Sequence, residues 1–363
     1  MINSKINLVN HTLPELESWF TDELKEPRFR AVQIWQWIWQ KLARDFDCMT
    51  NVSKSLRAKL GEIAEIRWPK VAASERALDG TTKFLLEFED GLKAETVLIP
   101  AENRAGEIRW TQCLSTQIGC PMACSFCATG QMGLKRNLTM GEILGQVLIG
   151  RDYLNDRRPD WPVLRNLVFM GMGEPLLNLG SLMPALRCLH DEAGLNFSPR
   201  RITVSTCGLE KGLEELGESG LAYLAVSLHA PTQELRSQIM PKASRWPLRD
   251  MIATLGSYPL KARERITFEY LLLGGVNDSP AHAAELVRLI QPLKAKLNLI
   301  VYNPVPGLPY KTPTPEAVEA FQRVLWQTNI TAILRKSRGA SIAAACGQLA
   351  ARDTIVTQNQ DKK

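Results

Sequence analysis

Three cysteines stand close together in one short stretch of this chain. Cys120, Cys124 and Cys127 have the spacing C-x3-C-x2-C and follow a predicted strand. Three thiolates on one loop can each bind one iron of a cubane cluster, which leaves the fourth iron without a protein ligand. An open coordination position is what a metal needs to bind and activate a substrate. A closed zinc site would need a further, distant ligand, because no fourth cysteine stands at the short spacing that such sites use.

The chain has eight cysteines, and four of them, from Cys113 to Cys127, fall within fifteen positions. Its first residues lack the charged-then-apolar pattern of a signal peptide, and no apolar run reaches the roughly 18–20 residues of a membrane span. We therefore expect a cytoplasmic protein with no membrane attachment, in which thiols stay reduced. There, crowded cysteines indicate metal or redox chemistry rather than structural disulfides.

The composition is that of a globular protein, with 45% hydrophobic and 23% charged residues among 363. The net charge of +6 is compatible with an anionic partner but does not identify one. Short basic clusters at 157–158, 200–201 and 335–338 could contact phosphates or could be solvated loops.

The first hundred residues predict helices over 13–24, 31–46 and 54–66, with the tryptophans of the second helix packed in a core. Strands over 81–88 and 92–99 around Asp90-Gly91 predict a hairpin that ends at Pro100. The polar stretch 102–107 is typical of a linker. We therefore predict an accessory domain over 1–100, a barrel domain over 101–352 and a polar tail over 353–363.

After residue 110 the pattern changes to strands alternating with helices of about ten to fifteen residues, such as 179–192 and 280–293. This alternation predicts an α/β fold with a parallel sheet and right-handed crossovers. In such folds the functional site lies at the carboxyl ends of the strands. The predicted strands are 112–117, 166–170, 201–205, 223–227, 266–272 and 297–302.

The cysteine motif, with Phe126 before its last cysteine, resembles that of the radical S-adenosylmethionine (SAM) superfamily. The resemblance extends over almost the whole chain to one family, the RlmN-type dual-specificity RNA methyltransferases and their relative Cfr. It implies a partial (β/α)6 barrel with a small N-terminal α+β accessory domain, a [4Fe–4S] cluster on Cys120, Cys124 and Cys127, and SAM. The matching stretches are 27–30, 95–97, 113–120, 127–130, 136–139, 170–175, 204–208, 227–229, 302–307 and 338–349.

The resemblance also assigns roles to residues outside the cluster motif. Cys346 would take a methyl group from one SAM, because a thiolate is a competent nucleophile. A radical made from a second SAM would activate that methyl group for addition to an adenine ring. Glu95, among apolar neighbours on its strand, would remove the ring proton. Cys113 would then release the product by forming a disulfide with Cys346.

The predicted SAM contacts follow from the same matches at strand ends. A carboxylate at Glu174 can hold an ammonium group, and Gly173 permits close approach of the backbone. Cys48, Cys188 and Cys207 have no matching role and are interpreted as ordinary buried thiols. The other predicted SAM contacts are Ser205, Ser227, Leu228, His229 and Asn303.

The predicted reaction is methylation of carbon 2 of an adenosine in the peptidyl-transferase region of 23S rRNA and of the adenosine 3′ of the anticodon in tRNA. Gln117-Ile118-Gly119 resembles RlmN more than Cfr, which methylates carbon 8. Two SAM molecules per turnover, a flavodoxin-like electron donor, a thiol reductant and a monomeric state are also expected. A radical SAM enzyme with a small-molecule or peptide substrate, and a zinc-containing RNA-binding protein, are the alternatives.

Overall fold

A computed structural model describes residues 5–103, 105–157 and 163–351, so the predicted polar tail over 353–363 lies outside the described residues. One long sheet runs through most of the molecule in the order β14-β13-β12-β11-β10-β9-β6-β5-β4-β3. Two short two-stranded sheets are separate from it: β1 (Ile6–Asn7) pairs with β2 (Ala64–Glu65), and β7 (Gln117–Gly119) pairs with β8 (Leu134–Asn137). The strands of the long sheet are β3 (Lys70–Arg76), β4 (Thr82–Glu87), β5 (Lys93–Glu102), β6 (Ile108–Cys113), β9 (Leu164–Phe169), β10 (Ile202–Thr206), β11 (Tyr223–Ser227), β12 (Ile266–Leu272), β13 (Ala295–Val301) and β14 (Ala332–Arg335).

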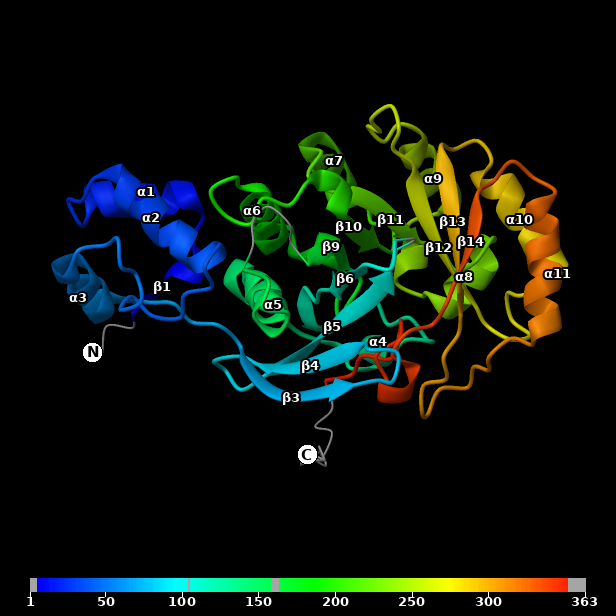
Figure 1. Cartoon of the computed structure of the whole chain (residues 1–363). Helices are drawn as coiled ribbons and strands as arrows, with labels where there is room; N and C mark the ends of the chain where they lie inside the picture. Colours follow the sequence, from blue (N-terminus) through cyan, green and yellow to red (C-terminus); the bar gives the residue numbers. More distant parts are fainter. Residues whose placement is uncertain (1–4, 104, 158–162, 352–363) are drawn as a thin grey trace, which may run out of the picture.

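Seven neighbouring strands, β6 and β9 to β14, pair in parallel, which confirms the predicted parallel α/β fold. Helices connect most of these strands and cover the outside of the sheet (Figure 1). β14 was not predicted, since its four residues are mostly exposed and lack a clear apolar pattern. The helices of this part are α4 (Ala128–Gln131), α5 (Met140–Tyr153), α6 (Leu179–His190), α7 (Glu210–Ser219), α8 (Gln233–Ile239), α9 (Leu248–Gly256), α10 (Pro280–Ile290) and α11 (Pro315–Trp326).

The strand that precedes the cysteine motif lies earlier than predicted. β6 runs over Ile108–Cys113 rather than 112–117, because its first residues pair with β5. Cys113 therefore stands at the carboxyl end of a barrel strand. The next residues lead into β7 (Gln117–Gly119), which pairs with β8 (Leu134–Asn137) and thereby closes the cysteine loop at its base.

The predicted hairpin is present as β4 and β5, but Pro100 does not end its second strand. β5 continues to Glu102. Pro100 lies beyond Leu98, the last residue of β5 that pairs with β4, so the missing N–H breaks no bond on that side. The stretch 102–107, predicted as a linker, instead joins β5 to β6 in a second hairpin. The accessory strands and the barrel strands consequently share one sheet.

Three helices form the N-terminal end of the molecule: α1 (Leu13–Asp22), α2 (Arg28–Trp39) and α3 (Lys54–Ile63). Thr12 begins α1 with a capping box to Glu15, and Ser53 caps α3. The first and third helices were predicted within a few residues, whereas α2 starts three residues earlier and ends seven residues earlier than expected. Trp35 and Trp39 are fully buried, which confirms the core role predicted for them.

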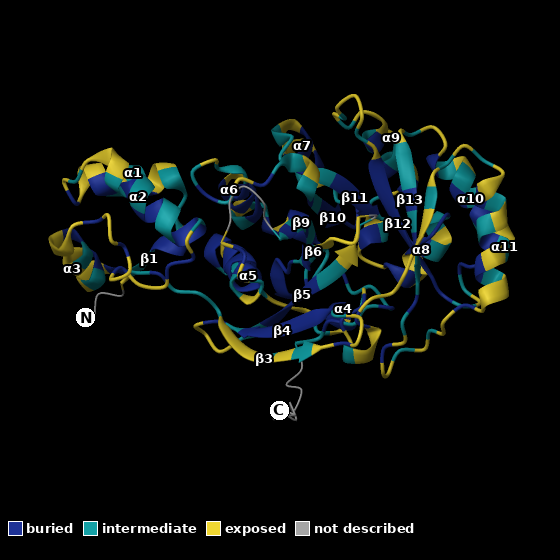
Figure 2. Cartoon of the chain, viewed as in Figure 1, coloured by how far each residue is buried: buried dark blue, intermediate teal, exposed yellow. Residues whose placement is uncertain are grey.

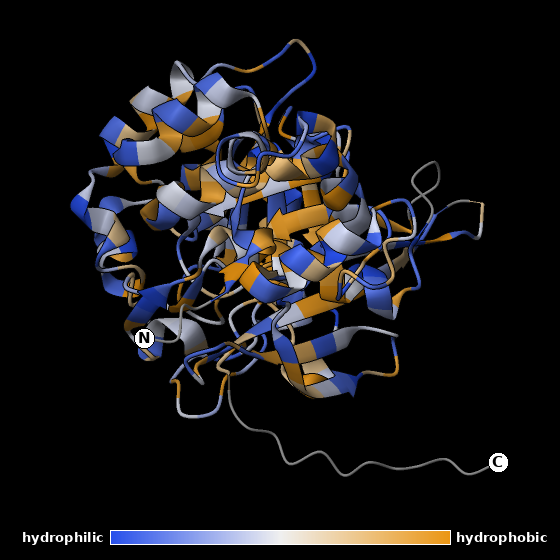
Figure 3. Cartoon of the chain, turned by 90° about the vertical axis from the view of Figure 1, so that its left-hand side faces the viewer, coloured by the Kyte–Doolittle hydropathy of each residue, from blue (hydrophilic) through white to orange (hydrophobic). Residues whose placement is uncertain are grey.

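The core is continuous from these helices into the barrel. β4, β11 and β12 are buried along most of their length, whereas β3 at the sheet edge is largely exposed (Figure 2). Seen from the side, the hydrophobic strands lie in the interior and polar residues occupy the surrounding helices and loops (Figure 3). No helix within the described ranges is both long and apolar enough to span a bilayer.

Candidate active site

Six of the parallel strands curve around one cavity with a volume of about 190 Å³. Each contributes residues at or near its carboxyl end, as the α/β pattern predicts. The strands form the first wall of the cavity and the cysteine loop forms the second. The segment 344–349, near the end of the described residues, forms the third. The strand residues in the lining include Cys113 on β6, Phe169 on β9, Ser205 on β10, Ser227 on β11, Glu269 on β12 and Ile300 on β13.

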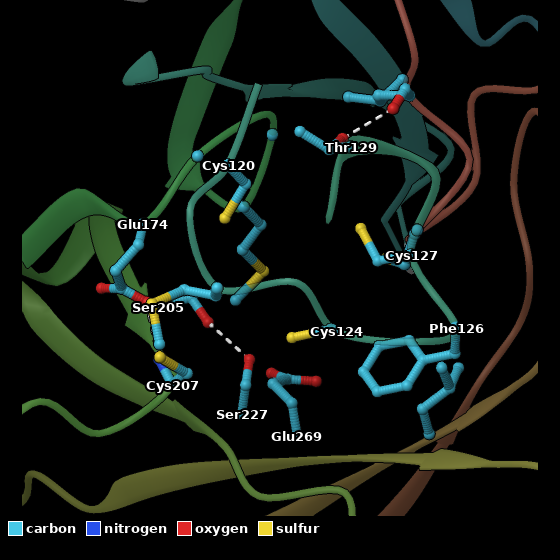
Figure 4. Close-up of a pocket in the computed structure, with 18 of the residues that line it drawn as sticks. Cys120, Cys124, Phe126, Cys127, Thr129, Glu174, Ser205, Cys207, Ser227 and Glu269 are labelled. Atoms are coloured by element: carbon cyan, nitrogen blue, oxygen red, sulfur yellow. Dashed lines mark hydrogen bonds between the residues drawn. The ribbon is translucent and has the colours of Figure 1, made fainter. Parts of the chain in front are cut away.

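The three cysteines of the motif all line this cavity, on the loop between β7 and α4 (Figure 4). Ala123 has a left-handed φ of 53°, which turns the loop between the first two cysteines. Burial raises the pKa of all three thiols, so iron must displace their protons on binding. The loop thus presents three sulfur ligands to one enclosed space, as a cubane cluster with one open iron requires.

A single metal ion fits these residues less well than a cluster does. Among the residues that the structure describes, no three His, Cys, Asp or Glu side chains converge closely enough to hold one ion. Thiolates that bind different irons of a cubane do not have to meet at one point, whereas the ligands of a tetrahedral zinc must. The thiol geometry therefore favours a cluster over the zinc alternative.

Glu174 lies in the cavity wall just after β9, where its carboxylate is almost fully buried. Its Oε1 accepts from the Leu176 N–H at 3.1 Å and its Oε2 accepts from the Cys207 N–H at 2.9 Å. Burial raises the pKa of Glu174, against these hydrogen bonds. Gly173 has a φ of 105°, and a Cβ there would come within 2.6 Å of Gln117, so only glycine fits. Both residues line the cavity, and their contact with SAM stays a prediction.

The other predicted SAM contacts divide into two groups. Ser205 and Ser227 line the cavity with their hydroxyl oxygens 3.5 Å apart, and His229 lines it with a left-handed φ of 56°. Leu228 is fully buried in the core and is absent from the cavity lining. Asn303 is absent from the lining, because its Nδ2 donates to Ser337 Oγ at 3.0 Å instead.

His229 is held as a neutral ring. Its Nδ1 accepts a hydrogen bond from the Leu271 N–H at 3.1 Å, so the proton of the neutral ring sits on Nε2. Burial, aided by the nearby Arg236 charge, lowers the pKa of His229 to about 3. The Phe126 ring packs edge-on against the imidazole, with centroids 5.1 Å apart. A neutral Nε2–H donor is therefore available at this side of the cavity.

The end of the described chain is fixed across the cavity by hydrogen bonds from two directions. Asp79 accepts from the Gly339 N–H at 3.1 Å on the accessory side. On the cluster side, the Ala128 N–H donates to Gly347 O at 2.8 Å, and Thr129 Oγ1 donates to Leu349 O at 2.6 Å (Figure 4). Cys346 lies between these attachment points and faces the cavity.

The two thiols with predicted roles outside the cluster loop line the same cavity. Burial, followed by the charge of Cys346, raises the pKa of Cys113 to about 12. The Cys346 thiol is open to cavity water, yet the surrounding walls partly desolvate it and, with the charge of Glu269, raise its pKa to about 11. Both thiols line the same cavity, so the fold brings them to one site although 232 intervening residues separate them in the sequence.

Glu95, the predicted base, does not line this cavity. It is buried on β5, where its Oε1 lies 3.1 Å from Lys83 Nζ. Its Oε2 accepts from the Ala350 and Ala351 N–H groups at 2.8 and 3.0 Å. The expected apolar setting of Glu95 is therefore wrong, because a lysine and two backbone amides surround the carboxylate.

Two residues that line the cavity had no functional role in the sequence-based prediction. Cys207, interpreted as an ordinary buried thiol, lines the cavity beside Glu174 (Figure 4). Glu269 lies in the wall formed by β12, and its Oε1 accepts from Asn298 Nδ2 at 2.8 Å. A signal was present for Glu269, since it is the only charged residue in the apolar strand 266–272. It was overlooked because it stands inside the strand rather than at its end.

Comparison with known families gives two matches that together cover most of the chain. A family described as "Ribosomal RNA large subunit methyltransferase N-terminal domain" matches residues 6–66. The radical SAM superfamily matches residues 114–287. The first match covers the N-terminal helices, and the second covers the cysteine loop and most of the parallel strands.

Relatives match over nearly the full length. A protein named dual-specificity RNA methyltransferase RlmN from Nitratidesulfovibrio vulgaris (strain DSM 19637 / Miyazaki F) is 65% identical over 348 residues, which cover 96% of this chain and 95% of the relative. One of the same name from Lawsonia intracellularis (strain PHE/MN1-00) is 58% identical over 354 residues, covering 98% of each. A crystal structure of a radical SAM methyltransferase from Sphaerobacter thermophilus is 43% identical, with a TM-score of 0.88, covering 96% of this chain and all of that one.

Proposed function

Since this chain belongs to the RlmN family of dual-specificity RNA methyltransferases, we propose that it methylates carbon 2 of adenosine in 23S rRNA and in tRNA by radical SAM chemistry. The observation that carries this proposal is the convergence of five cysteines, three from the cluster loop plus Cys113 and Cys346, on one cavity. An enzyme that only cleaves SAM to make a radical needs the first three alone. The other two supply a methyl carrier and a thiol that releases it.

Carbon 2 of adenine lies between two ring nitrogens and is electron-poor, so it is a weak nucleophile for ordinary methyl transfer. Cys120, Cys124 and Cys127 would hold a [4Fe–4S] cluster, which supplies the electron that cleaves SAM reductively. Glu174 and Gly173 would hold the amino end of SAM, and the hydroxyl groups of Ser205 and Ser227 would bind its polar atoms. Two SAM molecules would be used per turnover, one as methyl donor and one as radical source.

Cys346 carries the methyl group in this proposal, and Cys113 later attacks the Cys346 sulfur. Disulfide formation releases the methylated base, and an external thiol system then reduces the disulfide. The adenosine must leave its stack to enter the cavity, because ring chemistry needs access to the base. The C-terminal segment supports this arrangement because its hydrogen bonds to Ala128 and Thr129 fix Cys346 in the cavity lining.

Glu95 is proposed as the base that removes the ring proton. Its hydrogen bonds to Ala350 and Ala351 tie it to the segment that carries Cys346. For Glu95 to reach the adenine ring, these hydrogen bonds must open when RNA enters, while Lys83 still pairs with the carboxylate. We further propose a cytoplasmic monomer that takes electrons from a flavodoxin-like donor.

Nucleoside mass spectrometry tests the proposal directly. The protein is reconstituted anaerobically with iron and sulfide and incubated with SAM, a reductant, and either protein-free large-subunit RNA or tRNA. We expect 2-methyladenosine in both RNAs, and none with Cys346→Ala, which lacks the methyl carrier. Formation of 8-methyladenosine would place the enzyme with Cfr, and the absence of any methyladenosine from cluster-loaded protein would contradict the proposed function.

A further inference from the structure

We propose that Glu269 accepts the thiol proton of Cys346 when this cysteine takes its methyl group from SAM. The inference rests on the proposed function, in which Cys346 is the methyl carrier. It adds a second catalytic carboxylate to the enzyme, with a task separate from that of Glu95. Glu95 would remove a proton from RNA, whereas Glu269 would remove one from the protein before RNA takes part.

The sheet places Glu269 on the inner face of the barrel. In the parallel register it stands between Ser227 on β11 and Asn298 on β13. Asn298 Nδ2 donates to its Oε1 at 2.8 Å, which fixes the carboxylate. No hydrogen bond from the described residues reaches its Oε2, so that oxygen is free to take a proton. In Figure 4 the side chain lies beside Ser227, among the cavity residues.

Cys346 needs help to become a nucleophile, because a thiol with a pKa of about 11 is almost entirely protonated at neutral pH. Among the charged groups that act on this thiol, Glu269 has the largest effect. Burial raises the pKa of Glu269, which brings the carboxylate closer to the range suited to a base at neutral pH. The other titratable groups near this pair are Cys113 on β6, Arg335 on β14, Lys296 on β13, Cys127 on the cluster loop and His229 after β11.

The other buried carboxylates near the cavity are less suitable. Both oxygens of Glu174 accept backbone hydrogen bonds, from Leu176 and Cys207, and the carboxylate faces the cluster side. Glu95 lies outside the cavity, where Lys83 and two backbone amides bind it. Glu269 is the carboxylate of the lining that acts on Cys346 and keeps an oxygen free.

The proposed step balances without a further reactant. The S–H proton of Cys346 moves to Glu269 Oε2 as the sulfur attacks the methyl carbon of SAM. The new S–CH3 bond forms while the bond from that carbon to the sulfonium sulfur breaks. The pair of electrons in that bond stays on the leaving sulfur, which gives neutral S-adenosylhomocysteine. Glu269 returns its proton to water when the cavity opens.

Glu269→Gln separates this role from a merely structural one. Glutamine preserves the size of the side chain and an oxygen that Asn298 can bind, but it cannot accept the proton. Reconstituted protein is given SAM with a trideuterated methyl group, and the mass of the Cys346 peptide is followed with time, without RNA. We expect loading to slow by about 100-fold, the usual contribution of a general base. Glu214→Gln, on the exposed side of α7, is the matched control and should load normally.

The pH dependence gives a second readout. Without Glu269, loading depends on the fraction of thiolate, which rises tenfold per pH unit below the pKa of Cys346. The difference between the wild-type protein and Glu269→Gln should therefore shrink as the pH is raised. Variant protein that has finally acquired its methyl group should pass it to RNA at the wild-type rate. If the loading rate of Glu269→Gln stayed below that of the wild-type protein by the same factor at every pH, the proposal would be overturned.

The rate at which iodoacetamide alkylates Cys346 in the absence of SAM should rise in Glu269→Gln, whereas the rate of methyl loading falls. Removing the negative charge of Glu269 lowers the pKa of the thiol, so the variant should be alkylated a few-fold faster near pH 8. Slower loading combined with a raised KM for SAM and slower SAM cleavage would instead assign Glu269 to SAM binding and refute the base role. Failure of the wild-type protein to label Cys346 would contradict the proposed function itself, which is a distinct outcome.

Discussion

Cys113 stands at the carboxyl end of β6 and lines the cavity with Cys346, so its replacement should stop the cycle at one step. In Cys113→Ala, Cys346 can still be loaded and can still add to RNA, but no thiol remains to release the product. We expect a covalent protein–RNA adduct to accumulate, up to one per protein molecule, under single-turnover conditions. A gel shift that ribonuclease removes would detect this adduct.

Cys188→Ala is the control for this experiment, because Cys188 is also buried but lies on α6, away from the cavity lining. It should turn over normally and leave no adduct. Normal turnover by Cys113→Ala would show that another thiol or water releases the product, and the resolving role of Cys113 would be wrong.

At the scale of elements, the position of Cys346 depends on how the segment 339–351 is attached. Gly339 has a φ of 65°, and a Cβ there would come within 2.7 Å of Thr81 and 2.9 Å of Ala344. Gly339→Ala must therefore shift the segment as well as strain its backbone. A displacement of about 1 Å can cost roughly 100-fold in rate, so we expect methylation to fall by that order while the cluster absorbance stays unchanged.

Gly275→Ala provides the matched control for this segment. Gly275 also has a positive φ, of 73°, but a Cβ there would meet no atom within 4 Å. Both variants carry the backbone strain of a left-handed alanine, about 1–2 kcal/mol, and only Gly339→Ala adds the collision. Equal loss of activity in the two variants would contradict the role of the Gly339 contact in placing Cys346.

The elements also show how far the sequence could predict this structure. The pattern of apolar residues located β11 and β12 to the residue. It missed β14, and it misplaced the start of β6, because pairing with β5 rather than local pattern defines that strand. The three cysteines of the cluster motif were predicted from their spacing and the strand–helix pattern around them, and the structure places all three in one cavity lining. The hydrogen bonds that hold Glu95, and the presence of Glu269 and Cys346 in one cavity lining, depend on segments at least 77 positions apart and leave no local signal.

At the scale of the whole molecule, the N-terminal helices are built into the barrel rather than tethered to it. Trp35 Nε1 donates to Asp191 Oδ1 at 3.1 Å, and Gln40 Nε2 donates to Ala193 O at 2.9 Å, both just beyond α6. A buried Arg151 on α5 donates to Trp39 O at 2.5 Å. Together with the continuous core, these contacts predict that the two parts unfold together.

Trp35→Phe tests this coupling across the interface. Phenylalanine keeps an aromatic ring in the core but removes the N–H donor, which leaves the Asp191 carboxylate without its partner at this site. We expect the free energy of unfolding to fall by about 1–3 kcal/mol. Urea unfolding, followed by tryptophan fluorescence and by cluster absorbance, should show both signals shifting together to a lower midpoint.

Trp326→Phe is the matched control, because Trp326 is 62% exposed at the end of α11 and should change the midpoint little. The difference between the midpoints of Trp35→Phe and Trp326→Phe therefore reports the contribution of the interface, because both variants lose an indole ring. If Trp35→Phe shifted the fluorescence transition while the cluster transition stayed in place, the helices would unfold independently of the barrel. Coincident shifts would mean that a contact in the N-terminal helices stabilises the cavity itself, because one cooperative core carries both.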